Sequence, residues 1–241
     1  MERSKGDEVN RERYGHSETV DFYRGRQSLF PAERRALEGF VAPGSRLLDI
    51  GIGVGRTTAN LHASYDYVGI DWAPEMVLAA AEVNPGVELQ VGDAAELAFA
   101  DASFDAVLFS FNGIDSVSVQ NRRRVYREVC RVLRTDGIFI FSSHNPRWII
   151  LPPQDHSLRV FGGWLRRLPL AAARGISQTR FRRGRGTYID PIHGSVVMYS
   201  ASPRTVRMEL ADTGFKVVVV DPGRSPIGLT SPWFYYVGRK V

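Results

Sequence analysis

One short segment constrains the fold of this chain more than any other: Leu47-Leu48-Asp49-Ile50-Gly51-Ile52-Gly53-Val54-Gly55-Arg56. Its apolar start predicts a strand over 46–50 that is buried on both faces, as parallel strands are. Glycine tolerates a positive φ and lets a ligand approach the backbone closely. A helix beginning at about Arg56 would direct its free N–H groups toward the same point. The segment therefore predicts a strand–loop–helix unit that holds a nucleoside-containing cofactor.

A second apolar run, Val68-Gly69-Ile70-Asp71, ends in an acid about 20 residues after the first glycine. It predicts a second strand over 67–71. An acid at the end of this strand is placed to accept hydrogen bonds from the ribose hydroxyls of a bound nucleoside. Several classes of nucleoside cofactor share this feature, so the acid alone leaves the cofactor open.

The glycine spacing separates two of those classes. The dinucleotide fingerprint is G-x-G-x-x-G, with the pyrophosphate at the helix N-terminus. Here Gly51, Gly53 and Gly55 alternate, and Arg56 stands where the third fingerprint glycine would be. Asp49 precedes the loop, and a carboxylate there would repel a pyrophosphate but suit a cationic ligand. The pattern favours a sulfonium amino acid over a dinucleotide.

Predicted strands and helices alternate along most of the chain. Pro74 suits the first position of a helix, and Asn84-Pro85-Gly86 suits its end. Alternation of this kind implies a doubly wound α/β fold with a mostly parallel sheet and helices on both faces. The expected strands are 46–50, 67–71, 87–91, 104–110, 138–143, 215–220 and 233–237, and the expected helices are 56–64, 74–82, 119–133 and one from Ser202-Pro203 to Gly214.

The chain resembles the class I S-adenosylmethionine-dependent methyltransferases. The resemblance rests on the glycine loop, on Gly69-Ile70-Asp71 with the following Trp72 to Met76, on Gly92-Asp93-Ala94, and on the segments 104–110 and 133–140, in the family's order. It covers residues 40–145 well and 200–241 loosely. It implies a Rossmann-like, seven-stranded sheet with an antiparallel last strand. The implied cofactor is S-adenosylmethionine, with S-adenosylhomocysteine as product.

The same resemblance assigns a methyl-donor site. Asp71 is expected to accept from the ribose hydroxyls and Asp93 from the exocyclic amine of adenine, with Trp72 against the adenine face. Met76 is equally compatible with a place in the helix core. The glycine loop would line the amino-acid end of the donor. The expected cofactor-binding residues are Asp49, Gly51, Gly53, Gly55, Asp71, Trp72, Met76, Asp93, Ala94, Phe109 and Ser110.

Candidates for catalysis and acceptor binding gather at the same edge of the sheet. His144 ends the fifth strand and is the best general-base candidate, because an imidazole titrates near neutral pH. A structural rim histidine is the alternative, and proximity alone also suffices in many enzymes of this superfamily. Tyr23 and Arg24 could close over the cofactor. The expected substrate-binding residues are Tyr23, Arg24, Phe111, Asn112, Asp115 and Tyr199, with His193 a weaker candidate.

The expected organisation is an N-terminal arm or lid over 1–30 and a methyltransferase domain over 31–241. Residues 1–18 are polar and aperiodic, which predicts disorder. A basic cap is expected at about 145–187, where nine arginines accompany a single acid, Asp155. The net charge of the whole chain is only +5. The basic character therefore belongs to this segment and not to the fold.

The role of the cap stays open among four alternatives: an anionic small acceptor, nucleic-acid phosphates, a membrane surface or a solvated cover. The favoured function is methylation of a small molecule at oxygen or nitrogen, with an anionic metabolite as one form of acceptor. An RNA or DNA methyltransferase that uses the arginines is one alternative. A nucleotide-binding protein without catalysis is the other.

Several features that the sequence lacks limit the expected cofactors and cellular location of the protein. The single cysteine, Cys130, excludes an intrachain disulfide, and Cys/His clusters at metal-ligand spacing are missing, so no metal is expected. An apolar run of the length that spans a bilayer is also missing, and we expect no stable membrane insertion. The charged start lacks an apolar signal core. Together these features favour a cytoplasmic location.

Overall fold

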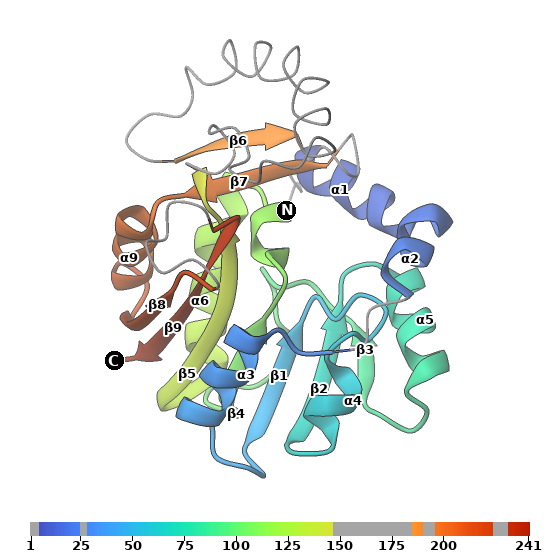
Figure 1. Ribbon diagram of the computed structural model, residues 1–241, viewed down its shortest axis with the longest axis horizontal. Helices are drawn as coiled ribbons and strands as arrows, with labels where there is room; N and C mark the ends of the chain where they lie inside the picture. The colour runs from blue at the N-terminus through green and yellow to red at the C-terminus, as the bar shows by residue number, and fades with distance from the viewer. Residues whose placement is uncertain (1–4, 25–27, 147–184, 190–195, 224–230) are drawn as a thin grey trace, which may run out of the picture.

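The computed structural model describes residues 5–24, 28–146, 185–189, 196–223 and 231–241. Its centre is a seven-stranded sheet with the order β3-β2-β1-β4-β5-β9-β8 (Figure 1). The predicted doubly wound α/β fold is confirmed. The strands are β1 Arg46–Ile50, β2 Asp66–Asp71, β3 Leu89–Val91, β4 Phe104–Phe109, β5 Leu133–His144, β8 Phe215–Asp221 and β9 Trp233–Lys240.

The first five strands pair in parallel, and β9 is antiparallel to both β5 and β8. The expected antiparallel last strand is therefore confirmed. The strand order reverses between β1 and β4, since β2 lies on one side of β1 and β4 on the other. In open α/β sheets a crevice forms outside the carboxyl ends of the strands at this point. The fold thus creates a ligand site where Ile50, Asp71 and Phe109 end their strands.

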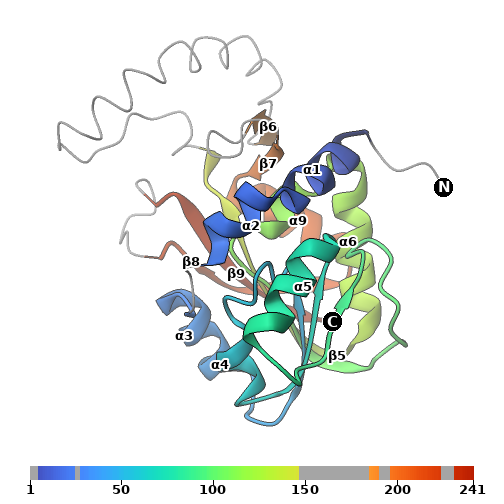
Figure 2. The same cartoon turned by 90° about the vertical axis from the view of Figure 1, so that its right-hand side faces the viewer.

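Helices cover both faces of the sheet (Figure 2). Apolar side chains of α3 and α4 pack on one face, and those of α6 and α9 pack on the other. Proline opens α3, α5 and α9, and serine hydroxyls cap α6 and α9. The helices are α3 Pro31–Phe40, α4 Thr58–His62, α5 Pro74–Val83, η1 Gly113–Ser116 (a 3₁₀ turn), α6 Val119–Val132 and α9 Pro203–Ala211.

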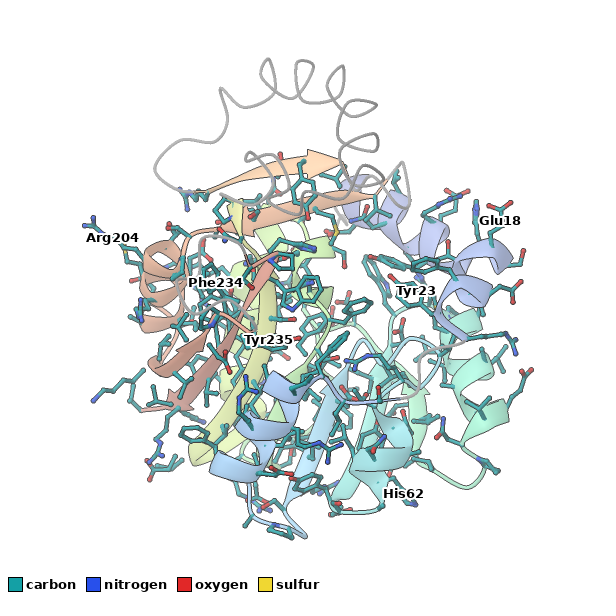
Figure 3. The ribbon with its side chains drawn as sticks, viewed as in Figure 1. Glu18, Tyr23, His62, Arg204, Phe234 and Tyr235 are labelled. Carbon is teal, nitrogen blue, oxygen red and sulfur yellow. The ribbon has the colours of Figure 1, made fainter. Side chains whose placement is uncertain are left out.

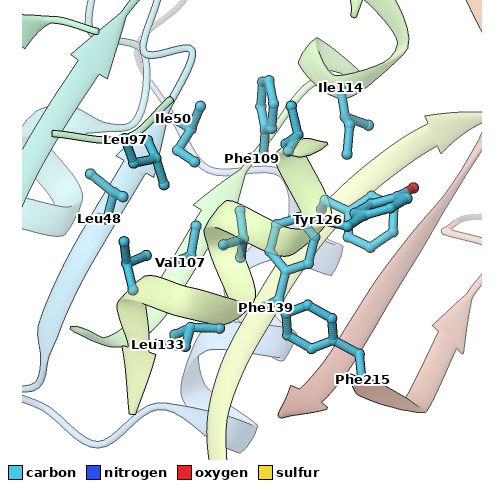
Figure 4. Close-up of a cluster of buried hydrophobic side chains, with 14 of the residues drawn as sticks. Leu48, Ile50, Leu97, Val107, Phe109, Ile114, Tyr126, Leu133, Phe139 and Phe215 are labelled. Atoms are coloured by element: carbon cyan, nitrogen blue, oxygen red, sulfur yellow. The ribbon is translucent and has the colours of Figure 1, made fainter. Parts of the chain in front are cut away.

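The main core lies between α6, α9 and the sheet (Figure 4). The face of α6 that its periodicity predicts, Val125, Val129 and Val132, is fully buried. Phe139 and Phe141 of β5 stack at a centroid distance of 4.7 Å. Complete burial of each such side chain contributes on the order of 1.5–3 kcal/mol. This packing fixes the carboxyl end of β5, and with it the position of His144.

The prediction that residues 1–18 are disordered or loosely held is wrong for residues 5–18, the part of this segment that the structure describes. Two helices, α1 Lys5–Gly15 and α2 Ser17–Arg24, lie over the carboxyl edge of the sheet (Figures 1 and 2). Asp7 is buried and accepts hydrogen bonds from the backbone N–H and hydroxyl of Ser118 and from the amide of Asn121, at 2.7–2.8 Å. Buried polar groups hold α1 in place, and hydrophobic periodicity does not register such contacts.

A second, two-stranded sheet stands above this edge. It pairs β6 Arg185–Ile189 with β7 Val197–Ala201 in antiparallel orientation. Asn10 of α1 joins it through hydrogen bonds to both the N–H and the carbonyl of Val197. Most of the expected basic cap, together with His193, lies outside the described residues. Among the described helices, none combines the length and apolarity that a bilayer crossing needs.

Candidate functional site

A cavity opens at the reversal point of the strand order. It encloses about 1200 Å³, the open solvent at its mouth included. Its floor is the glycine loop and the ends of β2 and β4, and its roof comes from α1 and α2. Of the expected cofactor-binding residues, the lining includes Gly51, Gly53, Asp71, Trp72, Met76, Asp93, Ala94, Phe109 and Ser110.

The glycine loop reaches the cavity through its first two glycines. Gly51 and Gly53 have φ values of 69° and 56°, in the left-handed region that disfavours side chains. A Cβ on Gly51 would lie 2.9 Å from the ring of Phe109, while one on Gly53 would meet nothing within 4 Å. Gly55 is also left-handed, but it packs against Asn84 and does not line the cavity. The loop therefore presents open backbone to a ligand at Gly53.

Asp71 ends β2 at the centre of the cavity wall. Its Oδ2 accepts from the N–H of Gly53 at 2.8 Å, and its Oδ1 accepts from the N–H of Ala73 at 2.9 Å. Burial raises the pKa of Asp71, and backbone hydrogen bonds from Ala73, Gly53 and Trp72 partly offset the rise. A carboxylate can accept about four hydrogen bonds. The carboxylate is thus held rigidly with acceptor capacity left for a ligand hydroxyl.

Asp49 lies beneath the loop and does not line the cavity. It is 1% exposed, and its Oδ2 accepts from the hydroxyls of Thr57 and Tyr67 at 2.6 and 3.1 Å. Burial raises its pKa to about 7, against the opposing effects of those bonds and of Arg56. The geometry gives Asp49 a place in supporting the loop, and its contact with the amino-acid end of the donor stays a prediction.

Arg56 occupies the position that distinguished this loop from a dinucleotide fingerprint. It forms a buried ion pair with Glu33 of α3 at 2.7 Å and donates to the hydroxyl of Ser110 at 2.8 Å. Its guanidinium lies 4.5 Å from the ring centroid of Phe30 and 5.6 Å from that of Phe111. A glycine here could make none of these contacts. Arg56 therefore ties the glycine loop to α3 and to the segment that follows β4.

The end of the cavity away from the glycine loop is lined by apolar side chains and by one acid, Asp93. Trp72, Met76 and Ala94 line it, and Met76 also packs in a buried cluster with Val20. Met76 is therefore a core residue that also lines the cavity, and its contact with adenine stays a prediction. Asp93 accepts from the N–H of Ala95 at 2.8 Å, which fixes its carboxylate at the rim. This combination of flat apolar walls and a fixed acceptor suits a purine carrying an amino group.

The segment after β4 is strained. Phe111 and Asn112 have φ values of 48° and 60°, which are uncommon for residues with a Cβ. The N–H of Asn112 donates to the hydroxyl of Ser142 at 2.8 Å, which holds the turn against β5. A Cβ on Gly113 would lie 2.4 Å from the ring of Phe109, so the next position accepts only glycine without rearrangement. Strain of this kind tends to occur at functional sites.

His144 lies beside this segment and is joined to Asp115. Its Nδ1 is 2.9 Å from Oδ2 of Asp115, and its backbone N–H donates to the same oxygen at 2.6 Å. Asp115 is fully buried and pairs with Arg122 at 3.0 Å. Asp115 is therefore buried behind the cavity lining, where it contacts His144.

The other residues expected to bind the methyl acceptor do not all line the cavity. Tyr23, labelled on α2 in Figure 3, lines the cavity. Its ring meets that of Phe111 edge-on at a centroid distance of 6.1 Å. Arg24 lies on the surface, paired with Asp21 and Glu82. Tyr199 is buried in β7, where its hydroxyl donates to Glu209. The structure therefore brings Tyr23 to the cavity but not Arg24 or Tyr199.

Sequence reasoning missed the contribution of α1. Asp7, Arg11 and Tyr14 all line the cavity, and the guanidinium of Arg11 lies 5.9 Å from the ring centroid of Trp72. Their spacing of four and three residues places them on one helix face, which was the available signal. Within the described ranges, no group of three or more His, Cys, Asp or Glu side chains is placed to hold a metal ion.

Comparison with known proteins agrees with this geometry. Residues 47–137 match the family model described as a methyltransferase domain. Over 133 residues the chain is 35% identical to phosphatidylethanolamine N-methyltransferase of Cereibacter sphaeroides. This alignment covers 53% of this chain and 64% of the relative. Over 108 residues it is 36% identical to demethylmenaquinone methyltransferase of Beutenbergia cavernae, which covers 44% of each. The chain thus spans about half the length of such curated relatives.

A solved structure extends the likeness to the whole fold. The 1,6-didemethyltoxoflavin-N1-methyltransferase of Burkholderia thailandensis, with 1,6-didemethyltoxoflavin and S-adenosylhomocysteine bound, superposes with a TM-score of 0.67. The alignment covers 100% of this chain and 92% of that one, at 16% identity. Fold and cavity define a Rossmann-like domain for a nucleoside cofactor. Residues 47–137 form a methyltransferase domain, and the chain has the fold of a class I S-adenosylmethionine-dependent methyltransferase.

Proposed function

We propose that this protein transfers the methyl group of S-adenosylmethionine to a small-molecule acceptor. The observation that carries the proposal is the placement of Asp71. Its carboxylate is clamped by two backbone N–H groups at the cavity wall, with acceptor capacity left for the two ribose hydroxyls. The same acid would also suit the adenosine ribose of a dinucleotide. The alternating spacing of Gly51, Gly53 and Gly55, with Arg56 in place of the third fingerprint glycine, favours a nucleoside without a pyrophosphate.

The other lining residues suit the remaining parts of the donor. Trp72, Ala94 and Asp93 would hold adenine, the carboxylate of Asp93 accepting from the exocyclic amine. The open backbone at Gly53 would face the amino-acid end. Phe109 and Ser110 would lie beside the ribose and sulfonium, since β4 ends there. These assignments place the reactive methyl near Phe111.

Methyl transfer makes modest chemical demands. The acceptor atom attacks the methyl carbon in line with the breaking carbon–sulfur bond, and the electron pair of that bond stays on sulfur. The leaving group starts cationic and ends neutral, so alignment and exclusion of water provide most of the rate gain. The anchoring of α1 through Asp7 and Asn10 would keep water from the cavity, and His144 is the proposed base.

The small-molecule acceptor is supported by the roofed cavity and by the range of relatives. Those relatives are named for phosphatidylethanolamine, demethylmenaquinone and 1,6-didemethyltoxoflavin. The nucleic-acid alternative depends on arginines such as Arg182 and Arg183, which lie outside the described residues. Among the described residues, the cavity itself favours the small molecule.

Isothermal titration calorimetry tests the choice of donor. We expect one molecule of S-adenosylmethionine or S-adenosylhomocysteine to bind per chain, and NAD to give no measurable heat at the same concentrations. Tight binding of NAD without binding of either sulfur compound would refute the proposal.

A further inference from the structure

Asp115 uses all of its hydrogen-bonding capacity to organise the end of β5. Its Oδ2 accepts from the backbone N–H of His144 and faces His144 Nδ1, while its Oδ1 accepts from the hydroxyl of Ser143 at 2.7 Å and from Arg122 at 3.0 Å. The side chain has no exposed surface. A buried carboxylate needs such partners. Of its three partner side chains, His144 is 19% exposed, whereas Arg122 and Ser143 are buried.

The bond to Asp115 selects the tautomer of His144. A carboxylate oxygen accepts, so Nδ1 must carry the proton. In the neutral ring, Nε2 then carries the lone pair. The amide nitrogen of Asn112, a donor, faces it at the long distance of 3.5 Å. His144 is half-buried, with 19% of its side chain exposed. Its Nε2 is therefore set up as a proton acceptor beside the strained segment.

Asn112 gives an independent sign of a ligand. It is 3% exposed, and its Oδ1 has no hydrogen-bond partner among the described residues. Buried oxygens in folded proteins are nearly always paired. The unusual backbone of Phe111 and Asn112 holds this oxygen in place. A polar hydrogen supplied by a bound molecule would satisfy it.

Aromatic rings surround the same position. His144 meets Tyr188 of β6 at 5.8 Å and Trp233 of β9 at 6.3 Å, and Trp233 meets Phe111 at 6.2 Å and Phe30 at 6.1 Å. Ring walls of this kind bind planar ligands by offset or edge-on contact. Phe111 also lines the donor cavity. The wall therefore runs continuously from the proposed methyl position to His144.

We propose that the acceptor is an aromatic compound with a hydroxyl group, and that Asp115 is the positioning residue that prepares His144 to take the hydroxyl proton. The inference rests on the proposed methyltransferase function. The O–H bond breaks and its proton joins His144 Nε2. The oxygen lone pair forms the new bond to the methyl carbon, and the carbon–sulfur pair returns to sulfur. The products are the methyl ether, neutral S-adenosylhomocysteine and an imidazolium beside Asp115, which then releases its proton to water.

The first test reads the tautomer directly and needs no acceptor. Nitrogen-15 NMR of the wild-type protein, with His144 assigned by the loss of its signals in His144→Gln, should show Nδ1 protonated and Nε2 unprotonated in the neutral ring. Asp115→Asn should reverse this, because its amide N–H would donate to Nδ1. A wild-type His144 that carries its proton on Nε2 overturns the positioning role, whether or not the Asn variant folds.

The second test uses labelled S-adenosylmethionine and a panel of phenols, naphthols and hydroxyquinolines, each paired with the matching arylamine. Transfer to at least one hydroxyl compound is expected, with a loss of about 100-fold or more in His144→Gln. The matched control His62→Gln, at an exposed helix position, should stay within about twofold. Transfer confined to amines, transfer that survives His144→Gln, or no transfer to any hydroxyl compound overturns the acceptor class.

Calorimetry separates this inference from the function on which it rests. His144 and Asp115 do not line the donor cavity, so both variants should bind S-adenosylhomocysteine as the wild type does. Failure of the wild type to bind it would refute the proposed function. Normal binding with the wrong tautomer or the wrong acceptor preference would refute the inference alone.

Discussion

The donor half of the cavity and the region around His144 are built from contacts of very different sequence separation. Asp71 is held by Ala73 and Gly53, which lie 2 and 18 residues away, and Asp93 by Ala95, 2 residues away. His144 is held by Asp115, 29 residues away, and Asn112 by Ser142, 30 residues away. The two carboxylates of the donor half are thus held within neighbouring strand–turn units, although the roof of the cavity comes from α1 and α2. The acceptor half exists only once β4, η1, α6 and β5 have packed together.

The largest expected effect lies in the acceptor half. Arg122 is buried and neutralises Asp115, so Arg122→Ala should lower the free energy of unfolding by about 3–5 kcal/mol, the cost of leaving a buried charge unpaired. Urea denaturation measures this. The neighbouring Arg123 forms an exposed pair with Asp212, and Arg123→Ala should cost about 0.5 kcal/mol or less. Equal losses in the two variants would mean that the network around His144 is not tightly built.

The next effect lies in the donor half and concerns binding. Asp71→Ala should weaken S-adenosylhomocysteine binding by about 2–3 kcal/mol, because two hydrogen bonds to a carboxylate are lost. Calorimetry measures the change. Asp66→Ala, at the exposed start of the same strand, is the matched control and should leave the affinity unchanged. If Asp71→Ala binds like the wild type, the ribose assignment is wrong.

The raised pKa of Asp49, which lies beneath the glycine loop, predicts that the free energy of unfolding depends on pH. Burial raises its pKa from 3.8 to about 7 in the folded protein, so between about pH 4 and pH 7 the unfolded chain loses this proton while the folded chain keeps it. Stability contributed by Asp49 therefore falls as pH rises, by up to about 1.4 kcal/mol per pH unit. The difference in unfolding free energy between wild type and Asp49→Asn should grow in favour of the variant over this range. A constant difference would contradict the buried position.

The smallest effect tests how closely the loop backbone is packed. Gly51→Ala should cost about 1–2 kcal/mol for its left-handed conformation, with a further cost from contact with Phe109. Gly39→Ala, in the last turn of α3 with open space around it, should instead stabilise by about 0.4–1 kcal/mol. Thermal unfolding of the pair measures both signs. The same sign in both variants would show that the loop has room to relax.

The sequence separation of these contacts also explains which parts of the site the sequence alone could predict. Gly51, Gly53, Asp71 and Asp93 were identifiable because a strand end and the turn after it sit within a few residues, so local pattern fixes local geometry. The pairing of Asp115 with His144 could not be predicted from the sequence, because hydrophobic periodicity does not reveal which turn packs against the end of β5. The order of α1 was missed for a related reason: Asp7 and Asn10 anchor it through polar contacts to distant elements.

A crystal structure of the complex with S-adenosylhomocysteine tests the central claim most directly, through the distances from the ribose hydroxyls to the carboxylate of Asp71. We predict that both hydroxyls lie within hydrogen-bond distance of that carboxylate, that adenine lies between Trp72 and Ala94, and that the sulfur faces Phe111. A ligand whose ribose lies elsewhere, with Asp71 still bound only to the N–H groups of Gly53 and Ala73, would contradict the account.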